Sequence, residues 1–306
     1  MQDIIEPVDK SEIKKELTSD KFLRHTNNGN NELYIITYHD APNTMREIGR
    51  LREVTFRAAG GGTGKDLDLD KFDHSEDPYK QLISWDPAEE EILGGYRYKV
   101  CDKQSKPEEL ATYKLFHFSD KFINEYLPYT IELGRSFIQP HFQSTGNTRK
   151  TLYALDNLWD GLGALVVKNP NNEYFFGKVT MYPHFNQKAR DLILYFLRKE
   201  FYDAYDLVHP KKPEKIITDQ SELEQILSAD TYEENLKILS QEVRKLGENI
   251  PPLINAYMNL SRTMKIFGTA LNKSFGNVEE TGIMITVRDI YPKKKERYVE
   301  TYRKEM

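Results

Sequence analysis

The most constraining feature of the sequence is residues 129–138, YTIELGRSFI, an apolar strand-like run with Glu132 and Arg135 on either side of Gly134. Residues three apart on a regular strand point to opposite faces of a sheet, so these two charges would not share a site. Glycine within a strand often marks a bulge, and one inserted residue would turn both charges to the same side and splay the neighbouring strands. The segment therefore predicts a bulged strand beside a cleft that contains a carboxylate.

The segment that follows, QSTGNT, supplies the second half of a candidate site through Gln143, Gly146 and Thr148. It opens a helix predicted over 148–167, and the N–H groups at a helix N-terminus attract anions. Arg149 adds positive charge there. A glycine turn that simply starts a helix is the alternative interpretation.

Strand-like and helix-like segments interleave along the chain. The runs ELYIITY, QLISW, ILGGYRYKV, YFFGKVTMY and GIMITVRDI have strand composition, and apolar residues at helical spacing predict further helices over 42–59, 186–205 and 221–246. No regular βαβ repeat is visible. The pattern predicts an α+β fold: a three-layer α/β/α arrangement with a mixed central sheet, extended at the C-terminus by helices and a strand.

Composition also divides the chain into three segments. Residues 1–30 end in the polar loop HTNNGNN and are expected to form an N-terminal arm. Residues 31–210 hold the interleaved strands and helices of the core. The break HPKKPEK precedes a C-terminal extension at 211–306, which is expected to complete the acceptor and acyl side of the site.

Further charged residues recur at short separations in the core. They are Arg52 with Phe56, Asp70 with Asp73, and Arg97 after a pair of glycines. Ordinary surface ion pairs, which contribute little energy, are the alternative interpretation. Arg97 and Glu132, however, lie in strands of a sheet covered on both faces, where an unpaired charge costs several kcal/mol. These charges must therefore find each other or a ligand.

The loop AGGGTGK resembles the end of a phosphate-binding loop but does not fit that motif. Ala59 stands where the first glycine should be, and Asp66 replaces the Ser or Thr that would hold magnesium. A predicted helix, rather than a strand, precedes the loop. A nucleotide triphosphatase is therefore not predicted.

Composition argues against other classes of protein. The single cysteine, Cys101, excludes an internal disulfide and a cysteine-based metal cluster, and no metal site is predicted. The formal net charge of −5 argues against a nucleic-acid-binding protein. No run approaches the roughly 18 apolar residues that cross a bilayer, and the N-terminus lacks the order of a secretory signal. The sequence therefore predicts a cytoplasmic protein.

These motifs resemble a known fold and family. A bulged, charged strand followed by Q-x-x-G-x-T at a helix start resembles the GNAT (acyl-CoA N-acyltransferase) fold, whose corresponding turn holds the pyrophosphate or phosphopantetheine of an acyl carrier. The blocks LREVTF, DKFD, ILGGYR, IELGR, LWDGLGALV and YFFGKVTM are similar, in this order, to those of the ornithine-lipid and glycine-lipid N-acyltransferases. IPPLINAYMNL resembles their C-terminal P-x-L-x-x-x-Y element. The same charged spacings occur in the acyl-homoserine-lactone synthases.

The resemblance implies transfer of a long fatty acyl group, expected to be 3-hydroxylated, from acyl carrier protein to the α-amino group of glycine or ornithine in aminolipid biosynthesis. An amine is mostly ammonium near pH 7, so a base is needed. Glu132 is the candidate base, and Arg97 and Arg135 complete the expected catalytic set. The residues expected to bind are Arg52, Phe56, Asp70 and Asp73 for substrate, and Gln143, Gly146, Thr148 and Arg149 for the phosphopantetheine of the donor.

Donor and partners follow from the same resemblance. No permanently bound cofactor is expected, because the donor would be the phosphopantetheine thioester of acyl carrier protein, with acyl coenzyme A as an alternative. Acyl carrier protein is acidic, so a basic docking patch is expected, with Arg149, Lys150, Lys188 and Arg190 as candidates. A lipidic product predicts peripheral contact with the inner membrane, for which LYFLRKEFYDAY and KKKERYVETYRK are candidate segments.

Two other functions stay open at this stage. A signal synthase of the acyl-homoserine-lactone kind would share the fold and the donor. A non-catalytic acyl-binding or membrane-active protein, hemolysin-like in name, would keep the pocket but tolerate loss of Glu132.

Overall fold

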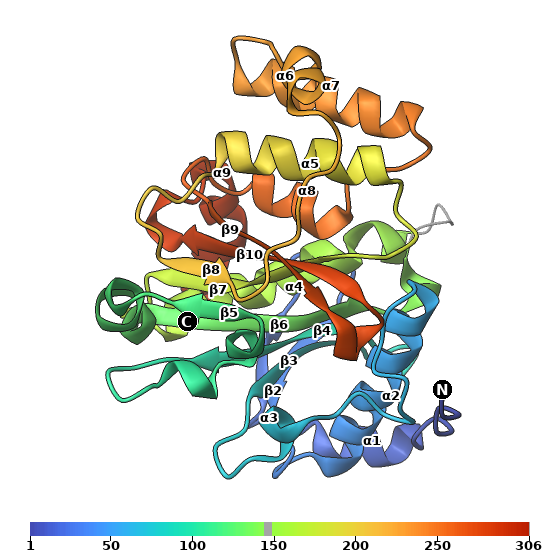
Figure 1. Cartoon of the computed structure of the whole chain (residues 1–306). Helices are drawn as coiled ribbons and strands as arrows, with labels where there is room; N and C mark the ends of the chain where they lie inside the picture. The colour runs from blue at the N-terminus through green and yellow to red at the C-terminus, as the bar shows by residue number, and fades with distance from the viewer. Residues whose placement is uncertain (144–148, 306) are drawn as a thin grey trace.

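The computed structural model describes residues 1–143 and 149–305 and is built on one eight-stranded sheet (Figure 1). The strands lie in the order β1–β2–β3–β4–β6–β7–β10–β9, and β5 and β8 form a separate two-stranded sheet. The strand bounds are β1 Phe22–His25, β2 Glu32–Ile36, β3 Lys80–Asp86, β4 Glu91–Val100, β5 Phe116–Phe118, β6 Thr130–Ile138, β7 Tyr174–Met181, β8 Val208–Pro210, β9 Lys265–Asn272 and β10 Val278–Thr286.

Strands β6 and β7 are parallel neighbours, whereas the other adjacent strands of the large sheet are antiparallel. Their pairing begins with Thr130 opposite Tyr174 and ends with Leu133 opposite Gly177, although both strands continue. A Cβ at Gly177 would lie 2.5 Å from the carbonyl oxygen of Leu133, so glycine is required at this close approach. Beyond this point β6 and β7 no longer pair with each other.

Strand β6 carries a bulge at the same place. Gly95 and Arg97 of β4 face Phe137 and Gly134 of β6, so β6 has one residue more than β4 across this step. Arg135 has a φ of 49°, in the left-handed region. The predicted bulge is confirmed, and Arg135 rather than Gly134 takes the unusual backbone conformation.

Helices cover both faces of the sheet, with α1 to α3 below it and α5 to α7 above it in Figure 1. Helices α1 and α2 pack on one face around Ile48, Ile83 and Trp85. Helices α4, α5 and α7 pack on the opposite face around Leu158 and Phe196. The helix bounds are α1 Lys10–Glu16, α2 Pro42–Ala58, α3 Lys71–His74, α4 Arg149–Lys168, α5 Gln187–Glu200, α6 Gln220–Ile226, α7 Tyr232–Lys245, α8 Pro252–Met258, α9 Pro292–Lys295 and α10 Thr301–Glu305.

Short helical turns connect these elements. Their bounds are η1 Pro107–Glu109, η2 Ala111–Lys114, η3 Phe122–Tyr126, η4 Leu127–Tyr129, η5 Pro140–Phe142, η6 Lys273–Phe275, η7 Val287–Asp289 and η8 Glu296–Glu300. With the mixed sheet and its two helical layers, the predicted α+β fold is confirmed.

The predicted helices differ from the observed ones in two places. The helix predicted over 221–246 is divided into α6 and α7, because the Thr231 side chain accepts from the backbone N of Glu234 and caps a new helix. The helix predicted over 186–205 ends as α5 at Glu200. In both cases the apolar spacing continued past a point where the backbone turns.

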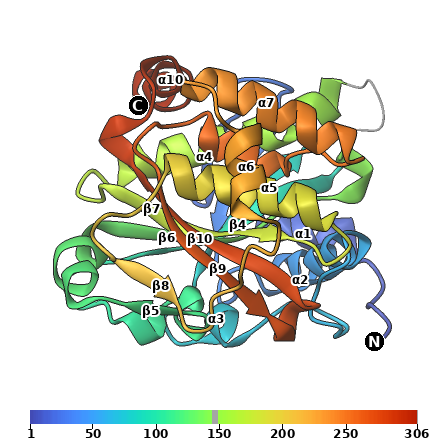
Figure 2. The same ribbon diagram turned by 45° about the horizontal axis from the view of Figure 1, so that its top comes forward.

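One sheet takes strands from all three predicted segments. β1 comes from residues 1–30, and β9 and β10 come from residues 211–306. Every residue of β7 pairs with β10, so the extension completes the sheet rather than forming a separate body. The C-terminal segment also packs inward, with Tyr298 and Tyr302 buried, and Figure 2 shows α10 near α4.

Within the described part of the chain, no helix combines the length and apolar character needed to cross a bilayer.

Candidate active site

A cavity of about 500 Å³ opens where β6 and β7 separate. Gly134 and Ser136 of the bulge line one side, and Lys178 of β7 lines the other. Among the described atoms, none lies within 4 Å of the position that a Cβ at Gly134 would take, so the bulge faces open space. Tyr257 of α8 also lines the cavity, which therefore receives a wall from the C-terminal extension. A larger cavity of about 930 Å³ beside the end of α5 contains none of the predicted site residues.

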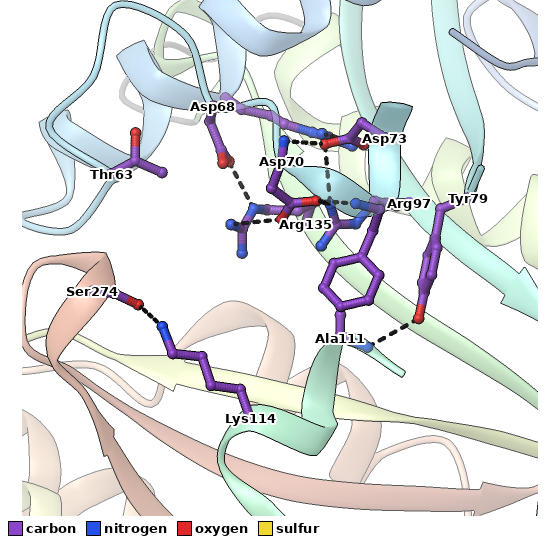
Figure 3. A network of polar contacts seen from close by, with 12 residues as sticks. Thr63, Asp68, Asp70, Asp73, Tyr79, Arg97, Ala111, Lys114, Arg135 and Ser274 are labelled. Carbon is purple, nitrogen blue, oxygen red and sulfur yellow. Dashed lines mark hydrogen bonds and ion pairs between the residues drawn. The ribbon is translucent and has the colours of Figure 1, made fainter. Parts of the chain in front are cut away.

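A set of paired charges, named here the aspartate–arginine cluster, forms and supports one wall of this cavity, which Asp70, Arg97 and Arg135 line directly. It consists of Arg52, Asp68, Asp70, Asp73, Arg97 and Arg135. Arg97 Nη1 donates to Asp70 Oδ1 at 2.7 Å and to Asp73 Oδ2 at 3.1 Å (Figure 3). Burial alone would raise the pKa of Asp73, but Arg52 and Arg97 outweigh burial and hold that pKa below its usual value. Three positive and three negative side chains thus balance each other.

The short helix α3 fixes two of these carboxylates. The Asp70 side chain accepts from the backbone N of Phe72 at 2.9 Å, and the Asp73 side chain accepts from the backbone N of Asp70 at 3.0 Å. This reciprocal arrangement is a capping box. The spacing of three between Asp70 and Asp73 therefore serves both the helix and the cavity wall.

Arg52 lies behind the cavity wall rather than on it. Its guanidinium is fully buried, lies 3.3 Å from Asp73 Oδ1 and also contacts the side-chain oxygen of Gln81. Phe56, one turn later on α2, does line the cavity and packs edge-on against Phe275, with ring centroids 5.1 Å apart. Arg52 thus supports the wall, whereas Phe56 faces the space for substrate.

Arg135 is the least firmly held arginine of the cluster. Its Nε lies 2.7 Å from Asp68 Oδ2, but the geometry is not that of a hydrogen bond, and Nη2 lies 3.7 Å from Asp70 Oδ2. The guanidinium stacks over the ring of Phe275 at 4.4 Å. Because its charge is paired without hydrogen bonds among the described residues, Arg135 is suited to exchange an aspartate for a substrate carboxylate.

Glu132 is buried, and both of its carboxylate oxygens accept hydrogen bonds. Thr112 donates to Oε1 from its hydroxyl at 2.6 Å and from its backbone N at 3.0 Å. The Tyr79 hydroxyl and the backbone N of Ala111, the latter at 3.0 Å, donate to Oε2. The predicted base lines the cavity, but in this arrangement it also holds the turn η2 against β6.

The opposite wall comes from β7, β9 and β10 and was not predicted. It is named here the β7–β10 cluster and consists of Lys178, Thr180, Asn272 and Glu280, all of which line the cavity. Lys178 Nζ contacts Glu280 Oε1, Asn272 Nδ2 donates to the same oxygen at 3.1 Å, and Thr180 Oγ1 donates to Glu280 Oε2 at 3.0 Å. The sequence did contain a signal for this wall, because Lys178 and Glu280 are charged residues within apolar strands, as Arg97 and Glu132 are.

The residues predicted to hold the donor are only partly described. Gln143 is exposed, and its Nε2 donates to the carbonyl oxygen of Ile138 at 2.6 Å. Gly146 and Thr148 lie outside the described residues. Arg149 begins α4, but its side chain is outside the described part of the chain.

Two of the four residues of the predicted basic docking patch, Lys188 and Arg190, already have acidic partners, and the side chains of Arg149 and Lys150 lie outside the described part of the chain. Arg190 is buried and paired with Asp191 and Glu279, and Lys188 is paired with Glu222. Within residues 1–143 and 149–305, no group of His, Cys, Asp and Glu side chains is arranged to hold a metal ion.

A cavity at the separation of two parallel strands, next to a bulge and lined by buried charges, defines the site of a GNAT-type acyltransferase. A family model for the acetyltransferase (GNAT) domain matches residues 51–152, which include β3, β4, the bulge and the aspartate–arginine cluster. The crystal structure of the AHL synthase LasI is a distant structural match, with a TM-score of 0.32 and 12% sequence identity over 48% of this chain and 71% of that chain.

Two curated relatives match along the full sequence. The glycine N(alpha)-acyltransferase of Phocaeicola vulgatus is 56% identical over 309 residues, which cover 100% of this chain and 95% of the relative. The glycine N(alpha)-acyltransferase of Bacteroides thetaiotaomicron is 58% identical over 307 residues, which cover 99% of this chain and 91% of the relative. The chain belongs to this family of N-acyltransferases, so the resemblance predicted from the sequence is confirmed.

Proposed function

We propose that this N-acyltransferase transfers a long, 3-hydroxylated fatty acyl group from the phosphopantetheine thioester of acyl carrier protein to the α-amino group of glycine, in aminolipid synthesis. The observation that carries the choice of glycine is the name shared by both full-length relatives. Glycine replaces the wider expectation of glycine or ornithine. Acyl coenzyme A is the alternative donor, and no permanently bound cofactor takes part.

The cavity supports this reaction by bringing an open backbone segment next to paired charges. A thioester carbonyl at the bulge would meet backbone groups of β6 that β7 no longer pairs, as at Gly134. Donors already in place there would stabilise the oxyanion of the tetrahedral intermediate, a contribution typically of several kcal/mol. Arg135 would bind the carboxylate of glycine and orient its amine toward the carbonyl carbon.

Positive side chains at the rim support the carrier protein as donor. Lys65, Lys71 and Lys114 line the cavity, are exposed and form no ion pair with a carboxylate in the described parts of the chain. Acyl carrier protein is acidic, so these lysines are a candidate docking surface in place of Lys188 and Arg190.

We place the reaction in the cytoplasm, with peripheral contact to the inner membrane when the amphiphilic product leaves. Within the predicted segment LYFLRKEFYDAY, Tyr202 and Tyr205 are exposed while Phe196 and Phe201 are buried. Exposed aromatic side chains are common at membrane interfaces.

The proposal is tested with the purified protein, 3-hydroxyacyl donors on acyl carrier protein or on coenzyme A, and glycine or ornithine. Mass spectrometry of the product and release of the free thiol are measured together. The proposal expects N-acylglycine as the main product and faster turnover of the carrier-bound donor. N-acylornithine as the main product, or thiol release without any acylated amine, would overturn it.

A further inference from the structure

The β7–β10 cluster has no role in the reaction as described so far. Lys178 is the first residue of β7 beyond the last pair with β6, so it lies at the point where the strands separate. Its side chain is 14% exposed, and that of its partner Glu280 is 1% exposed. The pair therefore occupies the cavity wall that faces the bulge.

We propose that the Lys178–Glu280 pair accepts the proton of the acceptor's ammonium group, which makes the wall of β7 and β10 the amine-binding side of the site. This inference rests on the proposed function and extends it by a catalytic group. Glycine then spans the cavity, with its carboxylate toward Arg135 and its amine toward Glu280.

The hydrogen bonds favour Glu280 over Glu132 as the proton acceptor. Glu132 accepts two hydrogen bonds on each oxygen, and two of the four donors are backbone N–H groups. Glu280 Oε2 accepts from Thr180 alone among the described residues. A carboxylate has about four acceptor positions, so Glu132 has none left for a substrate ammonium, whereas Glu280 Oε2 still has one.

Charges on neighbouring elements act on this pair. Burial, together with Arg135 and Arg97 across the cavity, lowers the pKa of Lys178, while Glu280 opposes this change. Burial raises the pKa of Tyr182, the residue directly after β7, and the charge of Glu280 raises that pKa further. Burial and the two arginines thus disfavour the charged form of Lys178.

The proton balance is complete without a further reactant. The ammonium of glycine loses one proton to the pair, and the neutral amine forms a C–N bond with the thioester carbonyl carbon. When the C–S bond breaks, the second proton lost from nitrogen goes to the departing thiolate, which leaves as a thiol. The pair then returns its proton to water.

The test compares glycine with aminooxyacetate, which has a carboxylate but an uncharged amine at neutral pH and so needs no base before attack. Glu280→Gln is expected to lower kcat/KM for glycine about a hundredfold or more, the usual contribution of a base, while aminooxyacetate stays within about threefold of wild type. Raising the pH should restore part of the glycine activity of the variant. Lys178→Met should show the same selective loss.

Glu279→Gln is the matched control. Glu279 is adjacent on β10 and also pairs with a cation, Arg190 at 2.8 Å, but it does not line the cavity. This variant should keep both activities. If Glu280→Gln does not fold, Lys178→Met carries the same comparison of glycine with aminooxyacetate. A wild-type rate that rises with pH more steeply for glycine than for aminooxyacetate is required by the inference, although any base would produce it.

Three results would overturn this inference but not the proposed function. They are an equal loss of activity with glycine and aminooxyacetate in a folded Glu280→Gln variant, equal pH profiles for the two acceptors in wild type, or unchanged glycine activity in the variant. The inference would also be overturned if aminooxyacetate restored the activity of Glu132→Gln but not that of Glu280→Gln. Glu132 would then be the base. Failure of the wild-type enzyme to acylate glycine at all would overturn the proposed function and this inference with it.

Discussion

Thr112 donates two hydrogen bonds to one oxygen of the Glu132 carboxylate, from its hydroxyl at 2.6 Å and from its backbone N at 3.0 Å. The carboxylate thereby joins β6 to the turn η2, which ends in Lys114. Lys114 in turn reaches across the cavity mouth to the hydroxyl of Ser274 (Figure 3). Glu132 thus positions a part of the wall that substrates must pass.

Glu132→Gln should lower stability as well as activity. The amide places an N–H₂ group where the native carboxylate accepts hydrogen bonds, and leaving buried donors unpaired costs about 1–3 kcal/mol. We expect a lower thermal midpoint and reduced turnover with both glycine and aminooxyacetate. Tyr79→Phe removes a single donor from the same carboxylate and should have a smaller effect, measured by thermal unfolding and the two-acceptor assay. A variant with wild-type stability would contradict this clamping role.

Asp73→Asn should weaken the fold most at neutral pH. Arg52 and Arg97 hold the pKa of Asp73 below its usual value against the effect of burial, so its ionised form stabilises the folded state. That stability is present above the unfolded pKa of about 4 and is lost as pH falls toward the lower folded pKa. Removing one partner of a buried ion pair costs about 3–5 kcal/mol.

Urea unfolding of wild type and Asp73→Asn between pH 7 and pH 3 measures this difference. The gap between the two proteins should narrow as the pH falls below about 4. Asp70→Asn, at a side chain that is 30% exposed, is the control and should cost less. A gap that stays constant with pH would show that the charge of Asp73 does not contribute.

The sequence predicted the wall made by β4 and β6 because charges inside apolar strands are conspicuous. Arg97 and Glu132 were found in this way, and the glycine between Glu132 and Arg135 predicted the bulge. The second wall was missed because its partners are remote: Lys178 and Glu280 are 102 residues apart and meet through the pairing of β7 with β10. Sequence spacing carries no information on such a pairing.

Ion pairing also explains why two arginines lie in places that the sequence did not predict. Arg52 shares helical spacing with Phe56, but α2 turns Arg52 into the buried side of the wall, where Asp73 neutralises it. Arg190 looked like a surface cation on α5. It is buried instead, because Asp191 and Glu279 neutralise it. Which cations are already paired is decided by tertiary contacts.

Lys71→Glu should slow turnover of the carrier-bound donor selectively. Lys71 is exposed at the cavity rim, and charge reversal there would repel an acidic carrier protein, more strongly at low than at high salt. We expect kcat/KM for the carrier thioester to fall at least tenfold at low salt, with little change for acyl coenzyme A. Lys188→Glu, away from the cavity, is the control. Equal effects on both donors would argue against docking at this rim.

Arg135→Lys should impair use of glycine more than it impairs folding. Arg97 is committed to Asp70 and Asp73 by hydrogen bonds, whereas Arg135 faces the cavity with its charge paired but not hydrogen-bonded to Asp68. A guanidinium binds a carboxylate through two parallel hydrogen bonds, and lysine cannot reproduce that geometry. Hydrogen bonds to charged groups contribute about 1.5–3 kcal/mol, so KM for glycine should rise about tenfold or more.

The matched variant is Arg97→Lys, in which the same substitution falls on the arginine held by two aspartates. It should chiefly lower the thermal midpoint and leave the preference for glycine over glycinamide intact. Arg135→Lys should instead lose that preference while the KM for the acyl donor stays unchanged. Steady-state kinetics with glycine and glycinamide for both variants separate the two roles. If wild type acylates glycinamide as well as glycine, no arginine of this cluster binds the acceptor carboxylate.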